Sequence, residues 1–451
     1  MRIARRQAAR LDAATIPQFV TPLWIPPAMP VAGLAPLSYS VAARPIAQQV
    51  LPPSLPATPV FAYGSTTDPA TFHAPSYTIE AVAGRPAEVT WANQLVDPAG
   101  SYVPPLLPVD PARPWANPPG GPDGRDRAPS AAAVPGPYTG PVPMVVRLHG
   151  ARAEQESDGC PQAWYLPAAT DIPDGYATAG SSYERFRQRY AEAHGHRWAL
   201  GTARFHYDND QRATQLWFHD HALGMTRLNV RAGLHGMYII RGGPRDLTHG
   251  QLPGPAPQPG DVRGTRYYEV PLILADATFN ADGSLHLPGA GGGDGPTGGP
   301  WEAALGSAIT VNGSTWPYLA VEPRRYRFRV LNAAGRRTFV LKVAASAATG
   351  PLAAPARPIW VIGADGGLLP AAVRVDEGGL PVRPAQCYDV IVDFTGLPAG
   401  TRLYLVNEGG AAAAGTTGLV LAFDVVPLES ADLSIPPGRL TGHLPAPPAD
   451  G

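Results

Sequence analysis

This 451-residue sequence contains only two cysteines, Cys160 and Cys387, and a single lysine, Lys342. Two cysteines form at most one disulfide, so a disulfide-rich scaffold is excluded. Charged residues make up 16% of the chain and the formal net charge is -1, so we expect no electrostatic attraction to nucleic acid or to an anionic membrane surface. The sequence also lacks a run of about eighteen apolar residues, so it predicts no transmembrane helix.

Glycine and proline, in contrast, are abundant, with 50 and 55 residues. Both are unfavourable inside helices and both mark turns. In a chain whose residues are 44% apolar, this composition indicates many short strands joined by loops rather than disorder. We therefore predict an all-β fold with long Pro/Gly-rich loops.

The first 54 residues are rich in proline and show no clear hydrophobic period. We interpret residues 1–54 as an N-terminal arm that lies over a domain. The pair Arg5 and Arg6 is not followed by the apolar segment of a secretory signal. A cytoplasmic location is therefore the expectation.

The strand patterns that follow fall into two similar stretches. We predict a first domain over residues 55–245, with a loop insertion at 98–140, and a second domain over residues 265–428. The Pro/Gly-rich stretch 246–264 is the predicted linker between them. Hairpin patterns in the two stretches resemble each other weakly, which predicts two copies of one β-sandwich module. Residues 429–451 are interpreted as a tail where a third domain would begin.

Three histidines lie on predicted strands. His219 and His221 alternate along one strand, so both imidazoles should project from one face and Asp220 from the other. His149 ends a separate strand. Imidazole binds copper, zinc, iron and nickel, but surface or hydrogen-bonded histidines give the same pattern. A mononuclear copper or zinc enzyme that uses all three histidines is one alternative.

Several longer segments carry a more specific signal, because each resembles the multicopper oxidase family. The nearest branch holds the spore-coat laccases, bilirubin oxidases and phenoxazinone synthases. The similar segments are Val145–Gly150, Asp158–Trp164, Leu216–Val230, Ala232–Ile240, Ile309–Tyr318 and Gly363–Pro370. Together they extend the resemblance over roughly residues 55–428.

The resemblance implies tandem cupredoxin-like Greek-key β-sandwich domains and a copper cofactor. In that family a type 1 copper takes electrons from a phenolic, aromatic amine or metal-ion reductant. A trinuclear cluster of one type 2 and two type 3 coppers, between the first and third domains, reduces O2 to water. By motif, His149, His219 and His221 match type 3 ligands, and Asp158 matches an acid that relays protons near the cluster. Asp158 is equally compatible with a purely structural turn.

Arg147 departs from the family pattern, because it stands where the family has the type 2 copper histidine. A guanidinium stays protonated and offers no lone pair to a metal. On an extended strand Arg147 would share a face with His149 and repel an incoming cation unless a carboxylate neutralises it. The alternative is a twisted strand that turns Arg147 to solvent.

The second departure concerns the late motifs of the family. No histidine occurs between His286 and His443, and no methionine follows Met237. The His-Pro-x-His-x-His and His-Cys-His motifs of the family's third domain are therefore absent, and neither cysteine has the neighbours of a type 1 copper thiolate. The sequence thus predicts a protein that lacks the third cupredoxin domain and has an incomplete copper site.

Two hypotheses follow from this combination. The first is a laccase-like protein that needs a separately encoded third cupredoxin domain to oxidise phenols, aromatic amines or metal ions with reduction of O2. The second is a non-catalytic cupredoxin-like structural or interaction module whose three histidines hold at most one metal. Arg147 favours the second hypothesis, because it removes a ligand from a strand that is otherwise intact.

Overall fold

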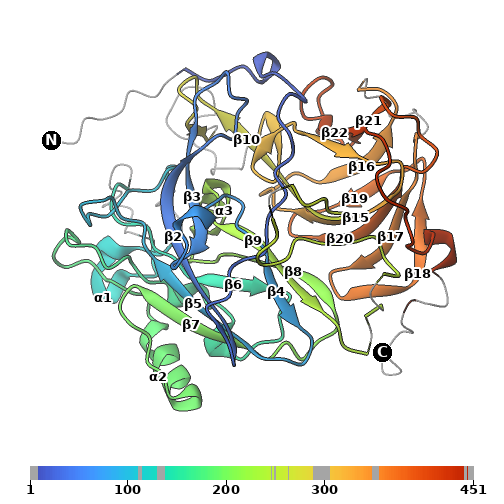
Figure 1. Cartoon of the computed structure of the whole chain (residues 1–451). Helices are drawn as coiled ribbons and strands as arrows, with labels where there is room; N and C mark the ends of the chain where they lie inside the picture. The colour runs from blue at the N-terminus through green and yellow to red at the C-terminus, as the bar shows by residue number, and fades with distance from the viewer. Residues whose placement is uncertain are drawn as a thin grey trace.

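The structure is a computed structural model, and strands dominate it (Figure 1). No helix in the described part of the chain is long and apolar enough to cross a membrane. The residues described are 9–109, 114–128, 138–244, 246–247, 250–262, 264–287, 305–347, 355–440 and 444. The predicted all-β class is confirmed.

The first half of the chain forms two sheets. One has the order β1-β2-β5-β7 with β3 paired to β2, and the other has the order β4-β9-β8-β6. The strands are β1 (Gly33–Leu34), β2 (Leu37–Gln48), β3 (Thr58–Ser65), β4 (Ile79–Val82), β5 (Ala87–Asn93), β6 (Val146–His149), β7 (Thr202–Tyr207), β8 (Thr214–Asp220) and β9 (His235–Arg241). The helices are α1 (Gly121–Gly124), α2 (Tyr183–His194) and α3 (Thr226–Ala232).

The second half forms two further sheets. One has the order β13-β12-β10-β15-β20-β17-β18 with β11 paired to β10, and the other has the order β14-β22-β21-β16-β19. The strands are β10 (Glu269–Phe279), β11 (Leu285–His286), β12 (Ala308–Val311), β13 (Ser314–Thr315), β14 (Tyr318–Val321), β15 (Arg325–Asn332), β16 (Phe339–Ala344), β17 (Ile359–Ala364), β18 (Gly367–Val375), β19 (Leu380–Val382), β20 (Cys387–Asp393), β21 (Arg402–Asn407) and β22 (Leu419–Val425).

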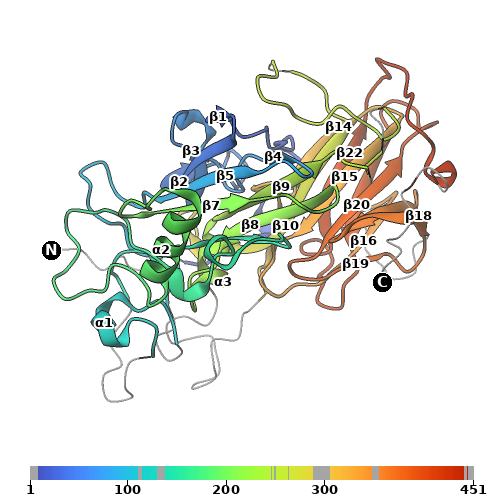
Figure 2. The same ribbon diagram turned by 90° about the horizontal axis from the view of Figure 1, so that it is seen from below.

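Each half has its own hydrophobic core between its two sheets, as expected for sheets that are apolar on one face. Trp91 and Phe218 lie in the first core, with their ring centroids 5.1 Å apart. Phe328 and Phe423 lie in the second, 5.7 Å apart. Figure 2 shows the two halves side by side, with the blue-to-green strands of the first half next to the orange strands of the second.

The predicted arm of residues 1–54 is wrong in its second part. β2 (Leu37–Gln48) is a central strand that pairs with β3 and β5. Residues 37–41 alternate between apolar and serine side chains, but the adjacent Ala42 and Ala43 are both buried, so the hydrophobic alternation stops in the middle of the strand. Ahead of β1, however, the chain does lie across the second half, because the Leu23 amide donates to the Tyr318 carbonyl.

The predicted insertion 98–140 packs more closely than a surface loop would. Leu107 and Trp115 are each 2% exposed and belong to the first core. Residues 110–113 and 129–137 of this insertion lie outside the described residues, as do parts of the predicted linker and tail. In the predicted tail, Leu440 and Leu444 are buried against the second half.

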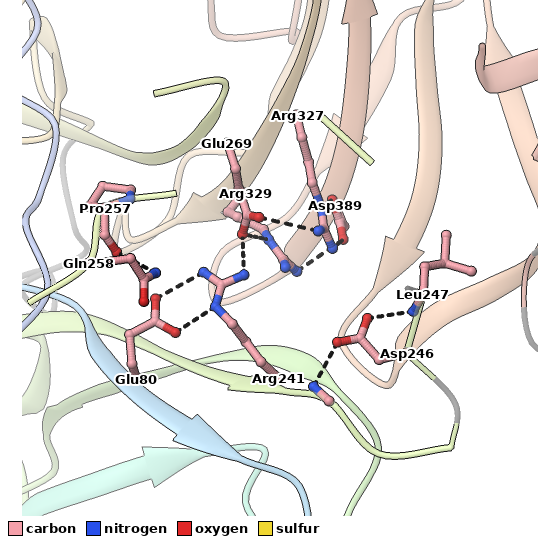
Figure 3. A network of polar contacts seen from close by, with 11 residues as sticks. Glu80, Arg241, Asp246, Leu247, Pro257, Gln258, Glu269, Arg327, Arg329 and Asp389 are labelled. Carbon is pink, nitrogen blue, oxygen red and sulfur yellow. Dashed lines mark hydrogen bonds and ion pairs between the residues drawn. The ribbon is translucent and has the colours of Figure 1, made fainter. Parts of the chain in front are cut away.

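A buried network of charged side chains joins the two halves (Figure 3). Arg241 on β9 donates to Glu80 on β4 and, across the junction, to Glu269 on β10, with Nη1 2.9 Å from Oε1. On the side of the second half, Arg327 and Arg329 on β15 connect Glu269 to Asp389 on β20. The network therefore connects β9 of the first half to β10 of the second half.

Candidate metal centre

Two neighbouring strands position the predicted site residues. β6 and β8 pair antiparallel, with Arg147 opposite His219 and His149 opposite Trp217. Val146 and Leu148 point into the first core, so the intervening Arg147 and His149 point to the other face of this sheet. The structure therefore brings together residues from strands that are about seventy positions apart in the sequence.

That face lines a cavity of about 550 Å³ between the two halves of the molecule, a size that suits a ligand or an inserted polypeptide segment. The first half contributes the three predicted histidines, Arg147, Trp217 and His235. The second half contributes an apolar wall with a polar edge. Its described members include Ile273, Ala275, Asp276, Phe279, Thr310, Ala333 and Arg336.

His149 and His219 are the closest pair of imidazoles in the cavity. His149 Nδ1 and His219 Nε2 are 3.4 Å apart, which is long for a hydrogen bond between ring nitrogens. Two imidazoles on one tetrahedral metal ion, with bonds of about 2.0–2.1 Å, have nitrogens about 3.3–3.4 Å apart. The separation in the structure therefore suits two ligands of a single ion.

Backbone carbonyls orient two of the histidine rings. Nδ1 of His219 lies 2.8 Å from the carbonyl oxygen of Asp220, and Nδ1 of His221 lies 2.8 Å from that of Gly159. A carbonyl only accepts, so each Nδ1 carries the proton and each Nε2 keeps its lone pair. This arrangement is typical of metal-binding histidines, whose second nitrogen is held by a hydrogen bond.

The surroundings keep the imidazoles neutral. Burial lowers the pKa of His219 to about 3. Desolvation, and after it the positive charge of Arg147, lowers the pKa of His149. The pKa of His221 is also lowered by burial, against a raising effect of the hydrogen bond to Gly159. At neutral pH all three rings are therefore unprotonated and can donate lone pairs.

Arg147 is not turned away from the cavity. Its Nη2 lies 3.5 Å from Oδ1 of Asp158, and the two side chains are 35% and 39% exposed. Asp158 is thus the carboxylate that neutralises the guanidinium. The sequence raised the possibility of such a partner but did not identify it. Asp158 matched a proton relay by motif, and the structure places it on Arg147.

Asp220 lies on the opposite face of β8 from the histidines, as the alternation predicts. It is 0% exposed and accepts hydrogen bonds from the amides of Val145 and Ala222 and from Asn229. Burial raises its pKa to about 7, although these hydrogen bonds act in the opposite direction. Asp220 therefore anchors the turn after β8 and does not face the cavity.

The donor atoms fit copper in kind but not in number. His221 is nearly perpendicular to His219, at 83° with ring centroids 5.7 Å apart, whereas the rings of His149 and His219 are at 45° and 5.6 Å apart. Within the described ranges, no three His, Cys, Asp or Glu side chains are grouped to hold one metal ion. Burial raises the pKa of Cys387 to about 12, so its thiol stays protonated at neutral pH.

The second-half wall of the cavity was not predicted from the sequence. Asp276 on β10 receives an ion pair from Arg337, with Nε and Oδ2 3.1 Å apart, and lies 4.0 Å from Nη2 of Arg231. His235 is buried beside this wall, and its Nδ1 lies 3.1 Å from the Val230 carbonyl oxygen. No local sequence pattern signals such a wall, because its residues meet only through the packing of the two halves.

Comparisons with known proteins agree with the geometry. The chain is 36% identical to a laccase of Bacillus subtilis over 309 residues, which cover 67% of this chain and 50% of the laccase. It is 34% identical to the multicopper oxidase LPR1 homolog 1 of Oryza sativa subsp. japonica over 398 residues, or 86% of this chain and 55% of that protein. The chain thus spans about half the length of these relatives. A scan against protein-family models finds no match.

Solved structures show the same fold. A laccase from Pediococcus acidilactici has a TM-score of 0.59 at 20% identity and covers 94% of this chain and 66% of its own. The McoA multicopper oxidase from Aquifex aeolicus has a TM-score of 0.56 at 22% identity and covers 92% and 67%. Together, the sequence identities and the shared fold lead to one conclusion. The chain belongs to the multicopper oxidase family.

Proposed function

We propose that the chain provides two cupredoxin-like domains of a laccase-like oxidase that oxidises phenols, aromatic amines or metal ions and reduces O2 to water. The observation that carries this proposal is the His149–His219 pair, with nitrogens 3.4 Å apart on the wall of the cavity. Copper bound there would supply the redox chemistry, because it cycles between two oxidation states and accepts imidazole ligands.

The chain's own residues have distinct tasks in this proposal. His149 and His219 would hold one copper ion, and His221 would be a ligand of a second. The carbonyl groups of Asp220 and Gly159 keep the rings of His219 and His221 in place. Trp217 packs against the His219 ring, with centroids 4.1 Å apart, and shields that side of the pair from solvent.

The rest of the copper ligands would come from polypeptide beyond these 451 residues. Between His286 and His443 the sequence has no histidine, and it contains no His-Cys-His motif. A further cupredoxin domain, encoded separately or in the same reading frame, would supply the missing ligands. The cavity of about 550 Å³ supports this idea, because it leaves room beside the three histidines for ligands from added polypeptide.

A second candidate function is a non-catalytic cupredoxin-like structural or interaction module. The observation that favours it is Arg147, which occupies a ligand position next to His149 and is paired with Asp158. In this case the three histidines would bind at most one metal, and no added polypeptide would produce oxidase activity.

Copper loading distinguishes the two functions. The chain is loaded under reducing conditions, air is admitted, and bound copper, visible absorption and O2 uptake with a phenolic donor are measured. We expect the chain to bind copper and the His149→Asn variant to lose this binding. We expect no intense blue band in the visible spectrum. O2 uptake should occur only after addition of a polypeptide that carries the His-Cys-His motif. O2 uptake by the 451-residue chain alone would contradict the need for further ligands. Absence of O2 uptake even after that polypeptide is added would favour the non-catalytic module.

A further inference from the structure

We infer that Arg147 is a built-in cation that takes the place of one metal ion at this centre. The inference rests on the proposed function, since it presupposes copper at His149 and His219. It concerns what the arginine does there, and not only that a ligand is missing. Three features of the structure support it: the position of the guanidinium, its partner, and the turn that holds that partner.

The position of Arg147 is that of a ligand. Arg147 is directly opposite His219 in the β6–β8 pairing, two residue pairs away from His149 and Trp217. It lines the same cavity as the three histidines. Because a guanidinium carries a positive charge at every physiological pH and has no lone pair, it contributes charge but no coordination.

Arg147 also has a dedicated partner. Its Nη2 is 3.5 Å from Oδ1 of Asp158, and the described residues give Arg147 no second carboxylate within ion-pair distance. The pair lies at the edge of the cavity, with about a third of each side chain exposed. A positive charge that is held in place by an anion is what a bound metal ion would otherwise provide at this position.

The turn that carries Asp158 is fixed against β6. Gly159 has a φ of +72°, and a Cβ atom on it would lie 2.2 Å from the Val146 carbonyl oxygen. Only glycine allows so close an approach. The carbonyl of this same Gly159 accepts the hydrogen bond from Nδ1 of His221. One turn therefore sets both the partner of Arg147 and the orientation of a metal-facing histidine.

These contacts lead to a prediction about the number of copper ions that the centre binds. With arginine at position 147 the centre should bind one copper fewer than with histidine there. The charge of Arg147 should also weaken binding at the His149–His219 pair, by about two- to tenfold for a partly solvated charge a few ångströms away. The arginine would thus set both the number and the affinity of the copper ions.

The test is the copper content of the metal-free chain after titration with Cu(I) under anaerobic conditions, followed by air oxidation and electron paramagnetic resonance. The variants are Arg147→His, which adds a ligand, and Arg147→Gln, which removes the charge only. Arg152→His is the matched control, because it adds a histidine at an exposed position of the following loop. Thermal unfolding confirms that each variant is folded.

We expect Arg147→His to bind about one more copper per chain, with an added paramagnetic Cu(II) signal. Arg147→Gln should keep the original number and bind about two- to tenfold more tightly, and Arg152→His should resemble the parent chain. Copper binding in the parent without a gain in Arg147→His would overturn the inference and leave the proposed function standing. Binding only in Arg147→His would support the built-in cation and contradict copper binding by the parent. No binding in any variant would overturn both.

Discussion

Two polar regions lie where the halves of this molecule meet, and they differ in how their groups are satisfied. In the charge network, Glu269 contacts three guanidiniums, those of Arg241, Arg327 and Arg329. In the cavity, the Nε2 atoms of His219 and His221 keep lone pairs that no backbone group uses. A network in which every charge is paired stabilises the fold, whereas neutral ring nitrogens that no backbone group uses are available to a ligand.

The pKa shifts of the buried groups also differ between the two regions. Burial alone would raise the pKa of Glu269, but Arg241, Arg329 and Arg327 outweigh it and hold that pKa far below its usual value. Burial lowers the pKa of His219 to about 3, and no carboxylate offsets it. The network is therefore stable only as charged groups, and the cavity histidines only as neutral ones.

Removal of one charge from the network should give the largest loss of stability. In Arg329→Met, Glu269 and Asp389 each lose a guanidinium that is 5% exposed. Breaking a buried pair from one side typically costs about 3–5 kcal/mol, which we expect in the free energy of unfolding measured by denaturant titration. The matched control is Arg402→Met, whose pair with Asp424 is largely exposed and should contribute less than about 1 kcal/mol. Equal effects would contradict a structural role for the network.

Acidification should act on histidines that are buried as neutral rings. Burial lowers the pKa of His235 from 6.5 to about 4. The unfolded chain takes up this proton near pH 6.5, but the folded chain does so only near pH 4. The free energy of unfolding should therefore fall by roughly 3 kcal/mol as the pH drops through this window, and stay constant with respect to this group above it. The His235→Gln variant should show a shallower pH dependence, and an unchanged slope would contradict the assignment.

A change at the turn beside the cavity should affect both stability and metal binding. In Gly159→Ala the new methyl group would meet the Val146 carbonyl, at a φ that favours glycine. We expect the free energy of unfolding, measured by thermal unfolding, to fall by about 1–3 kcal/mol. Copper affinity should also fall by about tenfold or more, because the carbonyl that orients His221 moves. Gly400→Ala is the control, because Gly400 is exposed, has a φ of +88° and has open space around it. This substitution strains the backbone without a steric contact.

Substitution of His149 should have the smallest effect on stability. His149 is exposed to the cavity, and the only polar contact of its ring in the described chain is the long one to His219. His149→Asn should therefore change the free energy of unfolding by less than about 1 kcal/mol while abolishing copper binding at the pair. A large destabilisation without copper in the parent chain would place His149 among the structural residues.

The sequence predicted the parts of the fold that have a local period or motif. β6 follows from alternation and ends at His149, and β8 ends at Asp220, between the two histidines that the motifs identify. β2 was missed, because its hydrophobic alternation stops in the middle of the strand at Ala42 and Ala43, which are both buried. Its place near the N-terminus suggested an arm, but pairing with β3 and β5 makes this segment a central strand.

The candidate site was predicted only on the side of the first half. The alternation on β8 placed His219 and Asp220 on opposite faces, and the structure agrees. The partner of Arg147 could not be identified, because Asp158 reaches it through a turn whose geometry depends on Gly159. The opposite wall with Asp276 arises from contacts between distant strands, and such contacts leave no trace in a short window of sequence.

The most direct test of the account is anomalous diffraction at the copper absorption edge from crystals of the copper-loaded chain. The account predicts an anomalous peak between the rings of His149 and His219, within about 2.0–2.1 Å of one nitrogen of each, and no peak at the Arg329–Glu269–Asp389 network. A peak at other histidines, such as the stacked pair His194 and His206, with none at His149, would contradict it.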